Sequence, residues 1–238
     1  ASSAALTRPG LGALASVVHG KAGWLAVGGV ATGVPSRPVV VVSASGTRWQ
    51  AAGGETAFAG PGIAVNQAAA GRSGYVIVGR QIIPARTVTN RTVVRGHEHV
   101  TSQVIPSRTV AAAWWSSRLT GWTRGAGVTA GDLAGTGSPQ MVGVTAAGAG
   151  FVAVGSAGRA PAAWTSSDGR HWRRTSLGSP VGASAALLQQ VAAQRNLIVA
   201  TGTKTTATGT APFAAYSTDR GTSWREVPLG APGGFASV

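Results

Sequence analysis

Residues 196–202 read NLIVATG, and residues 213–229 read FAAYSTDRGTSWREVPL. Both runs begin with apolar residues that alternate over a few positions, as half-buried β-strands do. After the second run, Ser217, Asp219, Gly221 and Trp224 frame a tight turn before a short final strand. Asp and Gly favour such a turn, because Gly accepts positive φ and the carboxylate can accept backbone N–H groups. This unit of strands, turn and tryptophan organises the whole chain.

The unit occurs four times along the sequence. Aromatic and aliphatic runs of the first kind lie at residues 23–29 (GWLAVGG), 74–80 (GYVIVGR), 150–156 (GFVAVGS) and 196–202. A second run follows each, at residues 38–43, 111–116, 162–166 and 213–217. A further apolar run precedes each unit, at residues 14–18, 63–67, 141–145 and 187–191. Four strands per unit, repeated radially, form a β-propeller blade, so we predict an all-β propeller of four-stranded antiparallel blades.

The turn frame is kept to different extents in the four units. The predicted turn residues are Ser43 and Trp49, Trp122, Ser166, Asp168, Gly169 and Trp172, and Ser217, Asp219, Gly221 and Trp224. The first unit has Ser in place of Asp, and the second has Arg118 and Leu119 in place of Asp-Gly. The motif S-x-D-x-G-x-S-W of the fourth unit resembles the Asp-box of BNR-type β-propellers, S-x-D-x-G-x-T-W. That resemblance implies a structural role for these turns, with each tryptophan covering the gap between adjacent blades.

The repeats divide the chain into units at about residues 11–53, 62–125, 140–178 and 186–229. We predict a single propeller domain, or a propeller fragment, over residues 1–238. The sequence FASV at residues 235–238 matches LASVV at 14–18, so residues 233–238 are interpreted as the start of a further unit. Either a fifth unit begins there and belongs to a larger ring, or this segment pads the ring.

The second unit carries an insertion at residues 81–110 in which Thr and Val alternate with polar residues. We interpret it as a long β-hairpin arm with its tip near residues 95–99; the alternative is a disordered surface loop. Additional structure on a repeat scaffold tends to lie on a binding face. The residues predicted for partner binding are basic or imidazole-bearing: Arg86, Arg91, Arg95, His97, His99 and Arg108.

The chain has 20 basic and 6 acidic residues, for a net charge of +14. This balance favours an anionic partner, although Arg enrichment can also record a GC-rich genome. The arm has no aromatic residue on which bases could stack, so an acidic protein or an anionic envelope polymer ranks above nucleic acid. The chain lacks Cys, and its first residues, ASSAALTRPG, are compatible with a processed secreted protein. We predict an extracellular or cell-envelope location; the oligomeric state is left open.

Asp-box propellers include the sialidases, which resemble one another in an arginine triad, a Tyr–Glu nucleophile pair and an Asp acid/base. Glycoside hydrolysis needs two carboxylates about 5–10 Å apart. Here the turns use Asp168 and Asp219, and Glu226 follows a box tryptophan on an outer strand, which leaves Glu55, Glu98 and Asp132 in loops or the arm. We therefore predict a non-catalytic binding or scaffolding protein without cofactor or metal. The alternatives are a sialidase-like hydrolase with catalytic residues partly outside this chain, and a subunit that another chain completes.

Overall fold

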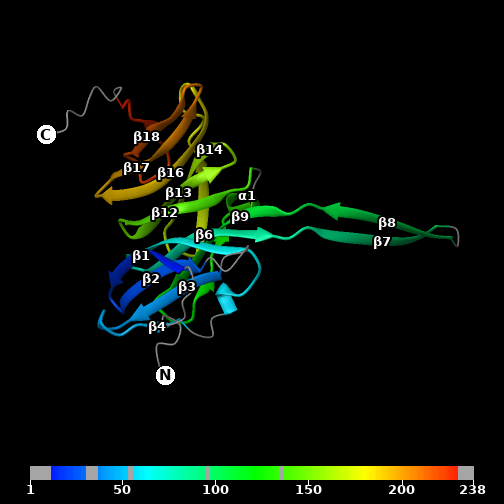
Figure 1. The fold of residues 1–238 in the computed structure, drawn as a ribbon, viewed down its shortest axis with the longest axis horizontal. Coiled ribbons are helices and arrows are strands. Elements are labelled where there is room, and N and C mark those ends of the chain that lie inside the picture. The colour runs from blue at the N-terminus through cyan, green and yellow to red at the C-terminus, as the bar shows by residue number, and fades with distance from the viewer. Residues whose placement is uncertain (1–11, 31–36, 53–55, 95–96, 135–136, 230–238) are drawn as a thin grey trace.

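The computed structural model describes residues 12–30, 37–52, 56–94, 97–134 and 137–229 (Figure 1). Strands dominate this part of the chain, with one 3-10 turn at Thr56–Phe58 and a short helix, α1, at Ala130–Ala134. No helix in the described ranges is both long and apolar enough to cross a bilayer.

The described strands form four consecutive blades. Blade 1 contains β1 (Gly12–Gly20), β2 (Gly23–Val30), β3 (Arg37–Ser43) and β4 (Gln50–Ala51). Blade 2 contains β5 (Ile63–Gly71), β6 (Gly74–Ile83), β9 (Arg108–Ser116) and β10 (Thr123–Arg124). Blade 3 contains β12 (Gln140–Ala147), β13 (Gly150–Ala157), β14 (Ala160–Ser166) and β15 (His171–Ser176), with β11 (Ala126–Gly127) added parallel to β15. Blade 4 contains β16 (Ala183–Gln194), β17 (Leu197–Thr206), β18 (Gly209–Ser217) and β19 (Arg225–Glu226).

Within each blade the strands follow chain order and pair antiparallel, so the predicted all-β propeller of four-stranded blades is confirmed. The first strand of every blade is the inner one, and consecutive inner strands contact each other: β1 with β5, β5 with β12, and β12 with β16. The apolar side chains accordingly form three clusters, each shared by two successive blades. The core is thus a series of interfaces between blades, because a single sheet has two faces to cover.

Each inner strand carries a β-bulge at the same place in the repeat. The extra residues are Ala15, Asn66, Val142 and Gln189, and all four line one hollow of about 440 Å³ between the inner strands. Opposite the bulges, the second strands carry Gly28, Gly79, Gly155 and Gly202, where a Cβ would overlap a carbonyl oxygen of the inner strand. This close approach explains the glycine near the end of every aromatic and aliphatic run in the sequence.

The insertion in blade 2 is a two-stranded arm. Strands β7 (Arg86–Val94) and β8 (His97–Ile105) pair antiparallel and project away from the blades (Figure 1). The β6–β9 ladder ends at Ile83 and Arg108, and the arm begins beyond Pro84 and Pro106. Proline cannot donate to a ladder, so these two residues separate the blade from the arm.

Candidate functional site

The connections of a blade lie on two sides of the propeller. In an antiparallel meander, the hairpin between strands one and two and the turn between strands three and four emerge at the same end. The connection between strands two and three emerges at the other end, and in blade 2 that connection is the arm. We call the first side the turn face. It carries the Asp-box turns, so these turns and the arm lie on opposite sides.

The turns of blades 3 and 4, which resemble Asp-boxes, are closed by their own side chains. In blade 4, Ser217 Oγ donates to Asp219 Oδ1 at 2.8 Å and accepts from Gly221 N at 2.8 Å. Asp219 also accepts from Ser223 Oγ at 2.6 Å and from Ser223 N at 2.9 Å. Hydrogen bonds from Ser223, with that from Ser217, lower the pKa of Asp219 to about 2. This carboxylate is therefore used to hold its own turn.

The box of blade 3 has the same architecture. Asp168 Oδ1 accepts from the backbone N–H groups of Arg170 and His171 at 2.8 and 2.9 Å. Its Oδ2 lies 2.7 Å from His171 Nδ1. Desolvation raises the pKa of Asp168, but hydrogen bonds from His171, Arg170 and Ser166 outweigh it and hold that pKa well below its usual range. Asp168, like Asp219, is committed to the turn.

The two eroded turns keep the same backbone path. In every blade the box tryptophan donates its indole N–H to the carbonyl three residues earlier: Trp49 to Gly46, Trp122 to Leu119, Trp172 to Gly169 and Trp224 to Gly221. The accepting residue has positive φ each time, including Leu119 at 69°. The sequence suggested a decayed box in blade 2, but the serine and tryptophan suffice to keep the turn. Leu119 accepts the left-handed conformation because its side chain is buried in the blade 1–2 core.

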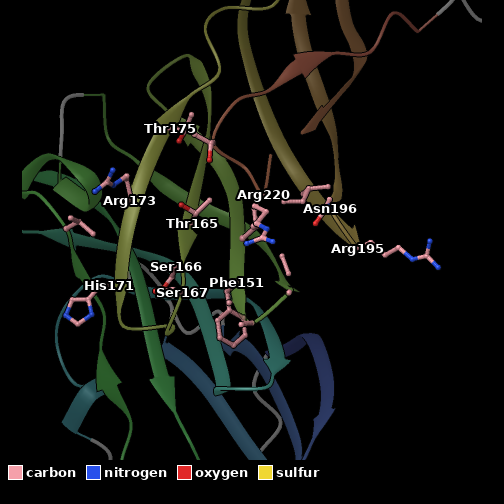
Figure 2. Close-up of a pocket in the computed structure, with 18 residues that line it drawn as sticks. Phe151, Thr165, Ser166, Ser167, His171, Arg173, Thr175, Arg195, Asn196 and Arg220 are labelled. Atoms are coloured by element: carbon pink, nitrogen blue, oxygen red, sulfur yellow. The ribbon is translucent and has the colours of Figure 1, made fainter. Parts of the chain in front are cut away.

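A groove of about 680 Å³ opens on the turn face between blades 3 and 4 (Figure 2). Its walls come from the β12–β13 and β16–β17 hairpins and from both complete Asp-box turns. Its polar lining consists of hydroxyl, amide and basic side chains: Thr165, Ser167, His171, Arg173, Thr175, Arg195, Asn196, Arg220 and Thr222. Phe151, Val152 and Ile198 are buried and form its apolar floor. The volume lies in the range of ligand pockets.

Three arginines give the groove its charge. Arg220 lies in the middle, and Arg173 and Arg195 extend away from each other on its two sides (Figure 2). Among the described residues, no salt bridge joins any of the three to a carboxylate. The charge of Arg173 nevertheless helps to lower the pKa of Asp132. Guanidinium groups spread in this way suit an extended anion with several charges better than a single carboxylate.

Arg195 and Arg220 both have left-handed backbone, with φ of 55° and 62°. Arg195 occupies the place in its hairpin that Gly148, with φ of 61°, occupies in blade 3. A residue with a Cβ costs about 1–2 kcal/mol in this region, whereas glycine does not. Two basic side chains at positions where glycine would be easier point to a use for their charge.

Basic residues recur across the whole turn face. The hairpins between strands one and two carry Lys21, Arg72 and Arg195, and the box turns carry Arg48, Arg118, Arg170 and Arg220. All seven are exposed. The guanidinium of Arg170 lies 3.8 Å from the centre of the Trp115 ring, which orients it by a cation–π contact. The face therefore presents positive charge in every blade, while its two aspartates stay ionised and hydrogen-bonded within their turns.

The arm residues predicted for partner binding do not form one surface. Strand alternation places Arg86 and His99 on one face of the arm and Arg91 on the other. Arg91 Nη1 lies 3.4 Å from Glu98 Oε1, so its charge is partly paired. Arg108 begins β9 at the base of the arm. Arg95 lies outside the described residues, and for His97 only the backbone is described. The sequence reasoning favoured this arm and missed Arg195, Asn196 and Arg220. These three lie on neighbouring loops of blade 4 and meet Arg173 only when blades 3 and 4 pack.

The remaining acidic residues have structural partners where they are described. Asp132, which the sequence left unassigned, is buried and accepts from Thr129 N at 2.6 Å and Arg174 N at 2.9 Å. Desolvation raises the pKa of Asp132. These two bonds and one from the Thr129 hydroxyl lower that pKa by a larger amount, so the net pKa shift is downward. Glu226 Oε1 lies 2.7 Å from Lys204 Nζ. Glu55 lies outside the described residues.

Comparison with known proteins places the fold among glycosidase propellers. No protein-family model and no curated protein sequence matches this chain. A β-fructofuranosidase from Bombyx mori superposes with a TM-score of 0.50 and 9% identity, over 92% of this chain and 50% of that enzyme. A putative glycoside hydrolase from Parabacteroides distasonis has a TM-score of 0.48 and 12% identity, over 92% of this chain and 72% of that one. A sialidase from Trypanosoma rangeli has a TM-score of 0.44 and 9% identity, over 91% of this chain and 37% of that one.

These structures share the propeller fold with this chain, and identities this low show the fold alone. The chain spans half the length of the silkworm enzyme. The comparison overturns our prediction that the protein is not an enzyme, because the fold is shared with a protein named as a β-fructofuranosidase. That prediction rested on the few carboxylates left over from the turns.

Proposed function

We propose that this protein binds an acidic polysaccharide on its turn face, with the groove between blades 3 and 4 as the main subsite. The observation that carries the proposal is the recurrence of exposed basic residues on the turns of every blade. A guanidinium can hold a carboxylate or sulfate through two parallel hydrogen bonds. A polymer with one acid group per sugar or disaccharide would meet such charges repeatedly as it crosses the face.

The groove supplies what a charged patch alone lacks. Thr165, Thr175, Thr222 and Asn196 line it beside the three arginines and can exchange hydrogen bonds with sugar hydroxyls. The fold is also that of proteins named as acting on carbohydrate. Both points favour a polysaccharide over the acidic protein that the sequence left as an alternative. Secretion to the cell envelope, where such polymers occur, stays a prediction.

The proposal is tested with oligogalacturonate as the probe and a neutral oligosaccharide of equal length as its control. Calorimetric titration at low and high salt should show binding of the charged probe only, weakened by salt because exposed charges are screened within a Debye length of about 10 Å at 0.1 M. Reducing ends are measured in the same samples, so that cleavage of the bound chain is detected if it occurs. Absence of binding at low salt would disprove the proposal.

A matched pair of variants separates the groove from net charge. Arg195→Ser with Arg220→Ser removes two charges from the groove, and Arg86→Ser with Arg108→Ser removes two from the arm side. If each of the two groove contacts contributes like a charge-assisted hydrogen bond, about 1.5–3 kcal/mol, the groove variant binds at least about a hundredfold more weakly. The arm variant should bind within about twofold of the parent. Equal loss in both variants would mean that only net charge is recognised.

A further inference from the structure

The three interfaces between blades are built in the same way. The box turn of one blade packs on the second and third strands of the blade before it. A Cβ on Gly221 of blade 4 would come within 2.8 Å of Thr165 Cγ2 and 3.7 Å of Val152 Cγ2, both in blade 3. In blade 3, Gly169 lies against Trp115 and Val76 of blade 2. In blade 2, Leu119 occupies the same place and lies in the core shared with Leu25 and Val42 of blade 1.

We call the receiving pair of each blade its seat. The seats are Leu25 with Val42, Val76 with Trp115, and Val152 with Thr165, and in each pair the two residues face each other across strands two and three. The corresponding pair in blade 4 is Val199 with Tyr216. The second-strand seat residue is 0% exposed in blades 1 and 2 and 2% exposed in blade 3, but Val199 is 37% exposed. Blade 4 thus has a seat that no described turn occupies.

Leu197 lies on the same face as Val199 and is 44% exposed. On the opposite terminal blade, Trp49 is half-buried and belongs to none of the three core clusters, whereas Trp122 and Trp172 are buried in theirs. Val17, on the side of blade 1 turned away from blade 2, is 57% exposed. The two outer faces therefore show apolar side chains at positions that the interior interfaces cover.

The curvature of the blades limits what can fit between these faces. Gln67 of β5 donates from Nε2 to Gln190 Oε1 of β16 at 3.2 Å, although a whole blade separates these strands in the order. Ala15 of β1 and Gln189 of β16 line the same hollow. Inner strands this close leave space for a single unit and not for a second set of four blades.

We propose that one further Asp-box blade, entered from the end of β19, packs on the free face of blade 4 with its turn on Val199 and Tyr216. This order follows the connection seen between the existing blades, where each outer strand leads to the next inner strand. Thr201 stands where blades 1 to 3 have Val27, Val78 and Val154. The facing residue of the further blade is therefore expected to be polar and to hydrogen-bond with the threonine.

Thiol labelling tests the open seat, because the chain has no cysteine of its own. Single variants Val199→Cys, Val152→Cys and Val181→Cys report the free seat, an occupied seat and an 85% exposed control position. Val199→Cys should react within about threefold of Val181→Cys and at least tenfold faster than Val152→Cys, whose reaction requires local opening. Slow labelling of Val199→Cys that becomes fast on dilution, with dimers in sedimentation, would assign the seat to a second copy and overturn the proposal.

The occupant is tested by a chain that carries a second copy of residues 183–229 after Val238. In that chain Val199→Cys should label about tenfold more slowly, and a cysteine at the matching place of the added blade should label fast. Unchanged labelling of Val199→Cys with a folded added blade would refute the proposal.

A second variant pair works whether or not the added blade folds. In the 238-residue chain, Val199→Glu should leave the unfolding midpoint within about 2 °C of the parent, whereas Val152→Glu buries a charge and lowers it severely. If Val199→Glu lowered the unfolding midpoint as much as Val152→Glu does, the seat of blade 4 would already be filled, which would contradict the proposal. Val152 also belongs to the floor of the arginine groove, but thiol labelling and unfolding midpoints do not depend on ligand binding, so the two proposals fail independently.

Discussion

Tyr75→Phe probes the interface between blades 1 and 2 at a single hydroxyl group. Tyr75 is 1% exposed, and its hydroxyl donates to Gly23 O at 2.9 Å and accepts from Ala22 N at 2.8 Å. Removing it leaves the carbonyl of Gly23, a buried residue, without this partner, at a cost of about 1–3 kcal/mol. Ala22 is exposed, so water can replace its bond and the further loss is about 0.5 kcal/mol. The total expected loss in the free energy of unfolding is about 1.5–3.5 kcal/mol.

Urea unfolding followed by circular dichroism measures this loss as a lower midpoint at unchanged slope. The thermal midpoint should fall by roughly 3–14 °C, since each kcal/mol corresponds to about 2–4 °C at this chain length. Tyr216→Phe is the matched control: Tyr216 is the other tyrosine of the chain, is half-buried, and its hydroxyl has no hydrogen bond to a described residue. That variant should change stability by less than about 0.5 kcal/mol. Equal effects of the two substitutions would refute the role assigned to the Tyr75 hydroxyl.

Three further predictions concern the turns and the arm. Gly169→Ala should destabilise the protein by about 1–3 kcal/mol more than Gly148→Ala in urea unfolding, because both glycines have positive φ but only at Gly169 would the new methyl meet a neighbouring blade. Because the pKa of Asp219 is lowered to about 2 when folded, its contribution to stability is complete above about pH 4 and is lost as the pH falls towards 2. Asp219→Asn should therefore be less stable at pH 7 and lose less on acidification, and an unchanged acid transition would contradict this. Replacing residues 84–107 by Asn-Gly should keep the thermal midpoint within about 2 °C, since Ile83 and Arg108 already pair; unfolding of blade 2 would show that the arm supports the core.

Much of the fold could be predicted because the information is local. Alternation of apolar residues identified the strands, and the recurring serine and tryptophan identified the turns, even where Leu119 replaces glycine. The four bulges were not predicted, since an extra residue in a strand leaves no clear mark when its neighbours are Ala, Asn, Val or Gln. The sequence shows a glycine at the same place in every unit. Only the structure shows the reason, which is that a side chain there would overlap a carbonyl oxygen of the inner strand.

The candidate site could not be predicted in the same way, because its residues meet only through packing of two blades. Arg195 and Arg220 are 25 positions apart in sequence and belong to different loops of blade 4, while Arg173 comes from blade 3. The arm attracted attention because it departs from the repeat. Its basic residues are divided between two faces, which the alternation of β7 and β8 already implied. A reading of strand parity in the arm would have shown this division.

The turn face illustrates how one loop can serve both the fold and a ligand. Within a box, the aspartate accepts from the serine and from backbone N–H groups, so its negative charge is satisfied by short-range dipoles and stays ionised well below neutral pH. The neighbouring arginine side chains have other contacts: Arg170 packs on the Trp115 ring, and Arg220 lines the groove. Because its hydrogen bonds keep each aspartate ionised, it offsets one positive charge of the face. In blades 1 and 2, Ser45 and Arg118 stand in place of the aspartate, so this offset is missing beside the exposed Arg48 and Arg118. Erosion of the Asp-box therefore makes the turn face more basic while the tryptophan bond preserves the turn, so the decay of the motif and the binding of an anion are compatible outcomes of the same sequence.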